Sequence, residues 1–349
     1  MGASRALDVL IVSLGSTAGL RAADEQLRDS LERAGARTDI VSAAPPRAQR
    51  TLMLTDLAWA RAARAATTNA LAKPRGARLP ALVYSTTTAA LLWPRPGAIR
   101  FDAPSAGNRP GRHGLWQRPL ERRRLAQAPL LLPWSEGGLR EAPRVAHGED
   151  RAMVLPVAVE PSGPPATARD IAAITYAANP RKKGIDRVLA AWRALRTAGG
   201  LESEELVIAG ASASELAAAG LRVDAHEGVR IVGALPAAEY RSLLRRARVF
   251  VCAPRREDYG IAQLEALADG CLLVSTPAPG PYAALPIAMT LDRRLVSEDL
   301  RAALRVALED PALDYATRAR AAIAPFARDA IDARVAGELL PRLLHNPVA

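Results

Sequence analysis

The residues best suited to chemistry are two glutamates, Glu257 and Glu265, which are separated by seven residues. Glu257 follows an apolar run over 249–253 and Pro254, whereas Glu265 lies in a segment with apolar residues at helical spacing. The pattern predicts a buried strand, a polar loop that holds Glu257, and a helix from Gly260 that carries Glu265 beside its apolar face. A carboxylate there needs a hydrogen-bonding partner, and the start of the helix favours an anion such as a diphosphate. The alternative is a surface acid followed by an acid at the helix rim.

Lys183 is a further candidate, because lysine is rare in this chain. The lysines are Lys73, Lys182 and Lys183, so arginine supplies nearly all of the positive charge. Two of them fall between a predicted strand over 171–176 and a predicted helix that starts at Gly184. This placement indicates selection for the compact ammonium group of lysine. The alternative is an ordinary exposed helix start.

Length and composition bound the function. A chain of 349 residues should form two domains, and 49% hydrophobic with 24% charged residues is typical of a globular protein. The net charge of +11 favours anionic partners, which include nucleotides, membrane phosphates and nucleic acid. The aromatic content of 4% and the lack of a nucleic-acid-binding motif argue against nucleic acid.

The cysteines and the apolar runs bear on location and metal binding. Cys252 and Cys271 lie in apolar runs, so we expect buried thiols in a reducing compartment and not a disulfide or metal pair. The four histidines show no metal-ligand spacing, and we expect no metal site. Asp8 interrupts the first apolar run, which favours a strand over a signal peptide, and no uninterrupted apolar stretch is long enough to span a membrane. The expected location is the cytoplasm, with peripheral contact to the inner face of the membrane as an open option.

The N-terminal pattern is that of a βαβ unit. A strand over 7–14, a helix over 20–34 and a strand over 38–42 are expected, joined at first by a turn of small residues. Gly15 and Ser16 in this turn are candidate nucleotide-binding residues. The turn departs from GxGxxG, and a simple tight turn is the alternative.

Strands and helices alternate along the rest of the chain, with one clear interruption. The stretch 161–165 is rich in proline and is the best linker. The predicted organisation is an N-terminal domain over 1–160, a linker over 161–168, a C-terminal domain over 169–325, and a C-terminal helix over 326–349 that packs back on the N-terminal domain. Before the linker we expect strands over 81–85, 98–102, 130–133 and 152–159, helices over 55–72 (capped by Thr55), 86–93 and 115–126, and a loop over 104–114; after it, strands over 171–176, 206–209, 229–232, 249–253 and 272–275, and helices over 184–197 and 237–247. This order indicates two α/β domains with parallel sheets, and the loops over 177–183 and 254–260 then lie at the carboxyl ends of strands, where such sheets bind ligands.

The motif Glu-x7-Glu, placed between a strand that ends in Ala-Pro and the strand over 272–275, resembles the retaining glycosyltransferases of family 4, also called glycosyltransferase group 1. The resemblance also covers Lys183-Gly184-Ile185-Asp186, the stretches 206–210 and 229–233, and more loosely 120–135. It implies the GT-B fold, in which two Rossmann-like doubly wound parallel-sheet domains face each other across a cleft. The implied activity is that of a hexosyltransferase-type enzyme, which moves a sugar from a nucleotide-diphosphate sugar to a glycan, lipid or lipid-linked glycan with retention of configuration.

The resemblance also implies roles for matching residues. Lys183 would hold the donor diphosphate, Glu265 would accept the ribose hydroxyls, and Glu257 would accept hydroxyls of the transferred sugar. Tyr259, Gly260 and Ile261 would bring backbone N–H groups near the phosphates, and Gly233 would begin the loop that faces the nucleobase. No cofactor is implied beyond the donor itself, a UDP- or GDP-sugar.

The chain departs from the family pattern at several positions. The arginine expected five residues before the lysine is Ala178, for which Arg181 is a substitute in the same loop. The histidine expected after the fourth strand is Phe101, and its neighbour Asp102 is the remaining catalytic candidate there. The Gly-Gly-x-x-Glu loop has become 279–283, Pro-Gly-Pro-Tyr-Ala. These departures keep two rival functions open: a catalytically silent nucleotide-sugar-binding protein and a sugar-nucleotide epimerase of similar two-domain shape.

The basic stretch over 112–124 raises the question of a membrane partner. Its arginines could bind an anionic membrane, with Leu115 and Trp116 as apolar anchors. The alternative is a solvated helix face.

Overall fold

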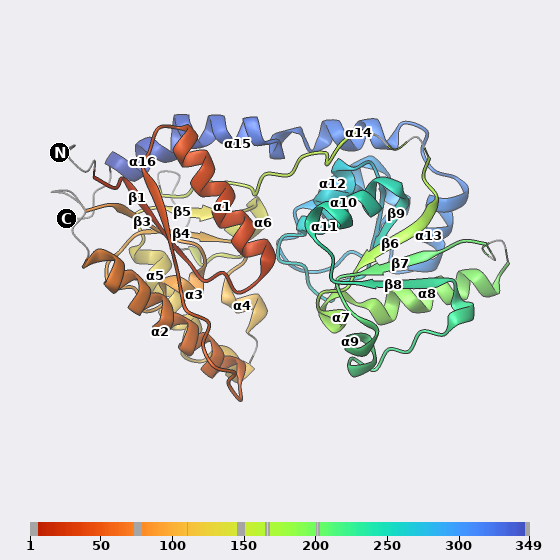
Figure 1. The fold of residues 1–349 in the computed structure, drawn as a ribbon, viewed down its shortest axis with the longest axis horizontal. Coiled ribbons are helices and arrows are strands. Elements are labelled where there is room, and N and C mark those ends of the chain that lie inside the picture. Colours follow the sequence, from red (N-terminus) through yellow and green to blue (C-terminus); the bar gives the residue numbers. More distant parts are fainter. Residues whose placement is uncertain are drawn as a thin grey trace. The chain divides into compact units, whose positions relative to one another are not determined.

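The computed structural model describes residues 6–72, 79–109, 111–144, 151–164, 166, 168–199, 201 and 203–345, and every structural statement below refers to these residues. Of the predicted loop, linker and C-terminal helix, Pro110, Pro165, Thr167 and 346–349 lie outside the described residues. The chain forms two compact units: unit 1 comprises Met1–Ala158 and Arg328–Ala349, and unit 2 comprises Val159–Ala327. Each unit holds a five-stranded parallel sheet with flanking helices (Figure 1), which confirms the predicted α/β class with two Rossmann-like sheets.

The sheet of unit 1 has the strand order β2-β1-β3-β4-β5. All of its pairs are parallel, and the interior strand β1 is buried along its whole length, as expected for a strand covered on both faces. The strands are β1 (Val9–Ser13), β2 (Thr38–Ser42), β3 (Ala81–Tyr84), β4 (Ala98–Phe101) and β5 (Leu131–Pro133).

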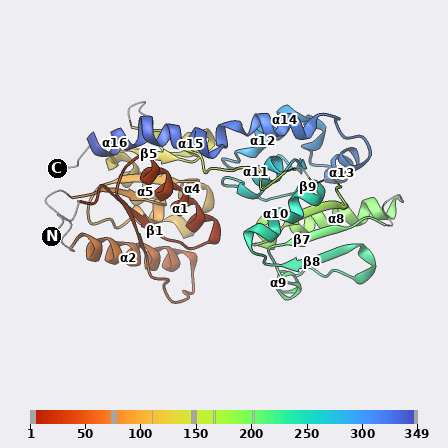
Figure 2. The same ribbon diagram turned by 45° about the horizontal axis from the view of Figure 1, so that its top comes forward.

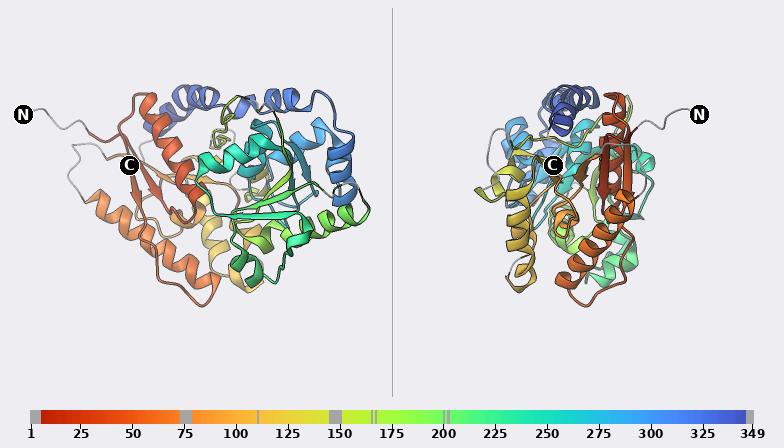
Figure 3. Two further views of the ribbon diagram at one scale, coloured as in Figure 1. Left: turned by 45° about the vertical axis from the view of Figure 1, so that its right-hand side comes forward. Right: turned by 90° about the vertical axis from the view of Figure 1, so that its left-hand side faces the viewer.

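Successive residues of these strands face opposite layers of helices. Val9 and Ile11 pack with Leu27 of α1 (Ala18–Arg33) and with the C-terminal segment, whereas Leu10 and Val12 pack against the other layer. The C-terminal segment consists of α15 (Arg328–Arg334), a π-helical turn (Val335–Leu339) and α16 (Leu340–His345), which lie beside α1 in Figure 3. The other layer holds α2 (Leu52–Leu71), α3 (Thr87–Ala90) and α5 (Gln117–Gln127), and two short helices, α4 (Ser105–Asn108) and α6 (Glu136–Glu141), complete the unit.

The C-terminal segment belongs to the core of unit 1. Val335 and Leu339 are fully buried in the cluster that contains Val9. An ion pair between Arg33 Nε and Asp332 Oδ2, at 2.7 Å, joins α1 to α15 at the surface. Apolar packing therefore provides most of this attachment, because an exposed ion pair contributes little.

The sheet of unit 2 has the order β10-β9-β6-β7-β8, and all of its pairs are parallel. The chain builds outward from β6 through β7 to β8, then returns to place β9 and β10 on the other side of β6. The strand order therefore reverses between β6 and β9, which is the topological switch point where such sheets bind ligands. The strands are β6 (Ile171–Tyr176), β7 (Leu206–Ala209), β8 (Val229–Gly233), β9 (Ala247–Cys252) and β10 (Leu272–Ser275).

Helices cover the sheet of unit 2 in two groups. α8 (Ile185–Thr197) packs with α13 (Leu300–Glu309), while α11 (Ile261–Ala268) packs with α10 (Ala237–Arg246) and α14 (Tyr315–Ala322). Figures 1 and 2 both show the group around α10 apart from α8, with strands between them. The short α7 (Pro180–Lys183) follows β6, and α9 (Ala213–Ala218) and α12 (Ala284–Leu291) complete the unit.

Several predicted elements differ from those observed. The stretch 152–159 is not a strand: the N–H groups of Met153 and Leu155 bond to β5 carbonyls, but β5 ends at Pro133, and Ser135 O, two residues further on, accepts from Leu139 N of α6. The predicted loop over 104–114 contains α4 and a 3₁₀ turn, and the basic helix begins at Gln117 instead of Leu115.

The predicted cap of the long helix α2 was also wrong. Its N-cap is Thr51, whose backbone is extended and whose hydroxyl accepts from Leu54 N. Thr55 lies inside the first turn, and its hydroxyl donates a hydrogen bond to Thr51 O. Both threonines suit a cap, and only the backbone conformation selects the first.

Candidate functional site

The loops that follow β6 and β9 meet at the switch point of the second sheet. Arg255 N donates to Lys182 O at 2.9 Å. Gly184 has φ +65°, and a Cβ atom at this position would lie 1.8 Å from Ala253 O. The glycine that follows Lys183 therefore has a physical cause, since only glycine permits both this backbone conformation and the close approach of Ala253 O.

Lys183 and Glu257, both predicted site residues, are in direct contact. Lys183 Nζ lies 2.6 Å from Glu257 Oε2, and the Glu257 side chain is only 6% exposed. The same oxygen accepts from Gln263 Nε2 at 2.9 Å. No described residue donates to Glu257 Oε1, so one oxygen of this carboxylate is committed and the other is available to a ligand.

A second set of ion pairs fixes the loop after β9. Asp258 is buried and receives Lys182 Nζ at 2.6 Å and Arg256 Nε at 3.0 Å. The side chain of the predicted residue Arg181, also on α7, is exposed, and its carbonyl accepts from Arg255 Nη1. The two neighbouring lysines thus have different partners, and only Lys183 reaches Glu257.

The predicted residues Tyr259, Gly260 and Ile261 form the entry to α11. Gly260 is the N-cap with φ +91°, and no side chain caps the helix, so its first N–H groups remain for other acceptors. Tyr259 is buried, and the ring of Tyr282 would lie 2.9 Å from a Cβ atom at Gly260. Tyr282, in the stretch 279–283 that departs from the family pattern, therefore packs against the start of this helix.

Glu265 lies in α11, and its side chain is 24% exposed. Burial raises the pKa of Glu265, and Arg241, with Nη1 3.5 Å from Glu265 Oε1, opposes this rise. Arg241 is thus the partner that a carboxylate on this helix face requires. The sequence patterns did not single out Arg241, because α10 holds several arginines, or Gln263, whose signal was an amide among the apolar residues of α11.

The remaining predicted residues lie at other strand ends. Gly233 ends β8 with φ +70°, accepts from Gly210 N at 2.7 Å, and has open space where a Cβ atom would stand. In unit 1, Gly15 follows β1 with φ +56°, and its neighbour Ser16 is exposed. Asp102 follows β4, and its Oδ1 accepts a hydrogen bond from Ala103 N at 2.8 Å. β3 lies between β1 and β4, which separates Asp102 from the glycine turn.

Both cysteines are buried free thiols, as predicted. Burial raises the pKa of Cys271 to about 12, which makes it unreactive. Within the described ranges, no three His, Cys, Asp or Glu side chains gather as a metal-binding group, and no helix is long and apolar enough to cross a membrane.

Comparison with known proteins bears on this site directly. Residues 169–310 match the family model of glycosyl transferases group 1. This group 1 segment lies within unit 2 and contains Lys183, Glu257 and Glu265. No curated protein matches the sequence.

Solved glycosyltransferase structures resemble the chain over both units and not only over the group 1 segment. Sucrose-phosphate synthase from Thermosynechococcus elongatus shares 17% identity, with 98% of this chain and 100% of that chain covered and a TM-score of 0.72. WaaG, a glycosyltransferase involved in lipopolysaccharide biosynthesis, shares 14% identity over 90% of this chain and 94% of its own, with a TM-score of 0.65. HepE from Anabaena, solved with UDP and glucose, shares 13% identity over 96% and 99%, with a TM-score of 0.64. These likenesses establish the GT-B fold.

Proposed function

We propose that the protein is a glycosyltransferase that moves a sugar from a nucleoside-diphosphate sugar to an acceptor hydroxyl with retention of configuration. The observation that carries the proposal is the contact between Lys183 and Glu257 at the switch point of the group 1 segment, with Glu265 on the adjoining helix. Structures of HepE with UDP-glucose and of the pneumococcal O-GlcNAc transferase GtfA with UDP and GlcNAc support a UDP-sugar as the donor.

The available hydrogen-bonding groups match the parts of such a donor. An ammonium group has three N–H bonds, so Lys183 can donate to the diphosphate while it keeps Glu257. The uncapped N–H groups at the start of α11 are further donors for the phosphates. Glu257 Oε1 accepts a sugar hydroxyl, and the carboxylate of Glu265 accepts the vicinal hydroxyls of the ribose.

In the transfer, the bond between the anomeric carbon and the β-phosphate oxygen breaks, and the nucleoside diphosphate keeps the electron pair. A new bond forms between the anomeric carbon and the acceptor oxygen, whose proton passes to an oxygen of the departing diphosphate. Lys183 and the dipole of α11 stabilise the negative charge that develops on the diphosphate. Arg181 of the same loop is proposed as a second positive charge. Within unit 1, Asp102 is proposed as a catalytic residue, and Gly15 and Ser16 are proposed as nucleotide-binding residues.

Two measurements test the function. UDP, GDP and ADP are first screened for thermal stabilisation of the protein, with Glu265→Ala as the control that should lose the effect. The radiolabelled sugar of the best donor is then followed into a mixture of glycan and lipid acceptors, and the anomeric configuration of the product is read by NMR. If no nucleotide stabilises the protein, the proposal fails.

The rival functions give different outcomes in the same experiment. A silent nucleotide-sugar-binding protein would be stabilised by the nucleotide but would neither transfer nor hydrolyse the sugar. An epimerase would convert the donor sugar without any acceptor. The departures at Ala178 and Phe101 are the sequence features that favour the first of these rivals, the silent binding protein.

An anionic membrane is the proposed site of acceptor delivery. Arg109, Arg118 and Arg124 are engaged in contacts inside unit 1, whereas Arg122 and Arg123 on α5 are exposed and Leu115 is an exposed apolar residue. The lipopolysaccharide connection of WaaG supports a lipid-linked acceptor. Vesicles with 30% anionic lipid should retain the protein in flotation and release the double variant Arg122→Glu/Arg123→Glu, whereas equal flotation with neutral vesicles would contradict this contact.

A further inference from the structure

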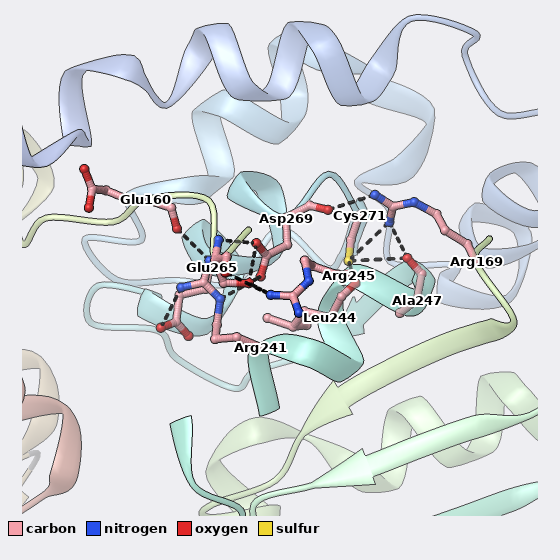
Figure 4. A network of polar contacts seen from close by, with 10 residues as sticks. Glu160, Arg169, Arg241, Leu244, Arg245, Ala247, Glu265, Asp269 and Cys271 are labelled. Atoms are coloured by element: carbon pink, nitrogen blue, oxygen red, sulfur yellow. Dashed lines mark hydrogen bonds and ion pairs between the residues drawn. The ribbon is translucent and has the colours of Figure 1, made fainter. Parts of the chain in front are cut away.

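The guanidinium of Arg241 lies between two carboxylates of unit 2 (Figure 4). Its Nε donates to Asp269 Oδ2 at 2.7 Å, and its Nη1 lies 3.5 Å from Glu265 Oε1. The remaining nitrogen, Nη2, donates to Glu160 O at 2.7 Å. Two of the side-chain nitrogens therefore donate hydrogen bonds, the third is in ion-pair contact with Glu265, and the side chain is only 13% exposed.

Asp269 is a fixed anchor for Arg241. Its side chain is completely buried, and it accepts from Ser162 N at 2.8 Å and from Ser162 Oγ at 3.0 Å. Arg245 Nη1 donates to the carbonyl oxygen of Ser162 at 2.9 Å and to the hydroxyl oxygen of Ser162 at 2.8 Å. Asp269 is thus saturated by protein donors, whereas the carboxylate of Glu265 is partly exposed and receives only Arg241 from the described residues.

We propose that Arg241 is the positioning residue for Glu265: anchored by Asp269, it holds the Glu265 carboxylate ionised and oriented toward the ribose hydroxyls of the donor. Through Ser162 and Glu160 the same anchor connects this carboxylate to the segment by which the chain enters unit 2. The inference rests on the proposed function, because it assigns a ligand to Glu265.

Arginine suits this role better than lysine. A planar guanidinium can donate in three fixed directions, whereas an ammonium on a flexible stem cannot span Asp269, Glu265 and the carbonyl of Glu160 together. Without Arg241, Glu265 and Asp269 would be two neighbouring carboxylates that share no cation. Protonation of Glu265 would relieve this repulsion, but one carboxyl oxygen would then be a donor, and the neutral group would accept the two ribose hydroxyls less strongly than the carboxylate does.

The test compares the affinities for UDP and for 2′,3′-dideoxy-UDP, which lacks both hydroxyls that Glu265 is proposed to accept. The unsubstituted protein should prefer UDP at least about tenfold. Arg241→Gln should bind UDP about tenfold more weakly and lose most of the preference, while its affinity for the dideoxy compound changes little. If Arg241 had a merely structural role, Arg241→Gln would lower the affinities for UDP and for the dideoxy compound by the same factor.

Arg246→Gln is the matched control, because Arg246 also lies on α10 but pairs with Asp170 and contacts neither Asp269 nor Glu265. This variant should keep the preference for UDP. Arg241→Lys, which keeps the charge and should fold even if Arg241→Gln does not, should reduce the preference at least threefold. An unchanged preference in Arg241→Lys and in any folded Arg241→Gln overturns the inference, whereas failure of the unsubstituted protein to bind UDP or GDP overturns the proposed function itself.

Discussion

Lys183 Nζ lies 2.6 Å from Glu257 Oε2, although 74 positions separate the two residues in the chain. They meet because the loops after β6 and β9 are neighbours at the switch point of the second sheet. The charges of the ammonium and the carboxylate compensate each other, and the buried Glu257 depends on this partner. A bound diphosphate would add a second anion to the same ammonium.

Lys183→Met should weaken UDP binding at least tenfold and lower the melting temperature, because it removes a charged partner of a buried carboxylate, a loss of about 1.5–3 kcal/mol. Lys182→Met is the matched control: its partner Asp258 retains Arg256, so UDP affinity should stay within about twofold. Isothermal titration calorimetry measures both. Equal losses in the two variants would contradict a specific role for Lys183.

Gln263→Leu should lower kcat about tenfold while the Kd for UDP changes little, because it removes one of the two donors that fix Glu257 Oε2. Gln263→Glu should be worse, since it sets one buried carboxylate against another. Steady-state kinetics with UDP titration separate the two quantities. A change in UDP affinity with unaltered kcat would show that Gln263 serves the nucleotide and not Glu257.

Gly184→Ala should destabilise the protein by at least about 3 kcal/mol, the sum of a left-handed alanine and an overpacked contact with Ala253 O. Gly233→Ala is the matched control: it has a similar φ but open space at the Cβ position, so it should cost about 1–2 kcal/mol. Urea unfolding followed by circular dichroism measures the difference. Equal destabilisation would mean that Gly184 is required only for its backbone conformation.

Glu265→Gln should stabilise the protein at neutral pH while it abolishes the preference for ribose hydroxyls. Burial raises the pKa of Glu265, so the folded state binds the proton more tightly than the unfolded state. The stabilisation from that proton is complete below the ordinary carboxyl pKa and is lost as pH rises through the raised pKa. Glutamine does not titrate, so the variant should melt at a higher temperature than the unsubstituted protein at pH 7.5 and at about the same temperature at pH 4.

A lower melting temperature for Glu265→Gln at pH 7.5 would contradict this account. It would mean that the ion pair with Arg241 outweighs the desolvation of the carboxylate. Differential scanning calorimetry at the two pH values decides between these outcomes.

Most strands could be predicted because apolar runs report burial directly. The strands over 171–176 and 272–275 were predicted at the observed bounds, since both run through the interior and end at a change to polar or small residues. Element ends were less predictable: Thr51 and Thr55 are equally suitable caps, and the local sequence does not distinguish them.

Residue types and local patterns are enough to identify the kinds of chemistry present: a lysine pair in an arginine-rich chain, and two glutamates on a strand-loop-helix segment. The partners of these residues follow only from the folded chain, and they are Glu257 for Lys183, Asp258 for Lys182, and Glu265 with Asp269 for Arg241. The cause is the different range of the interactions. Periodicity and turn chemistry act over a few residues, whereas these pairs form only after the sheet order places β6 beside β9 and packs α10 against α11.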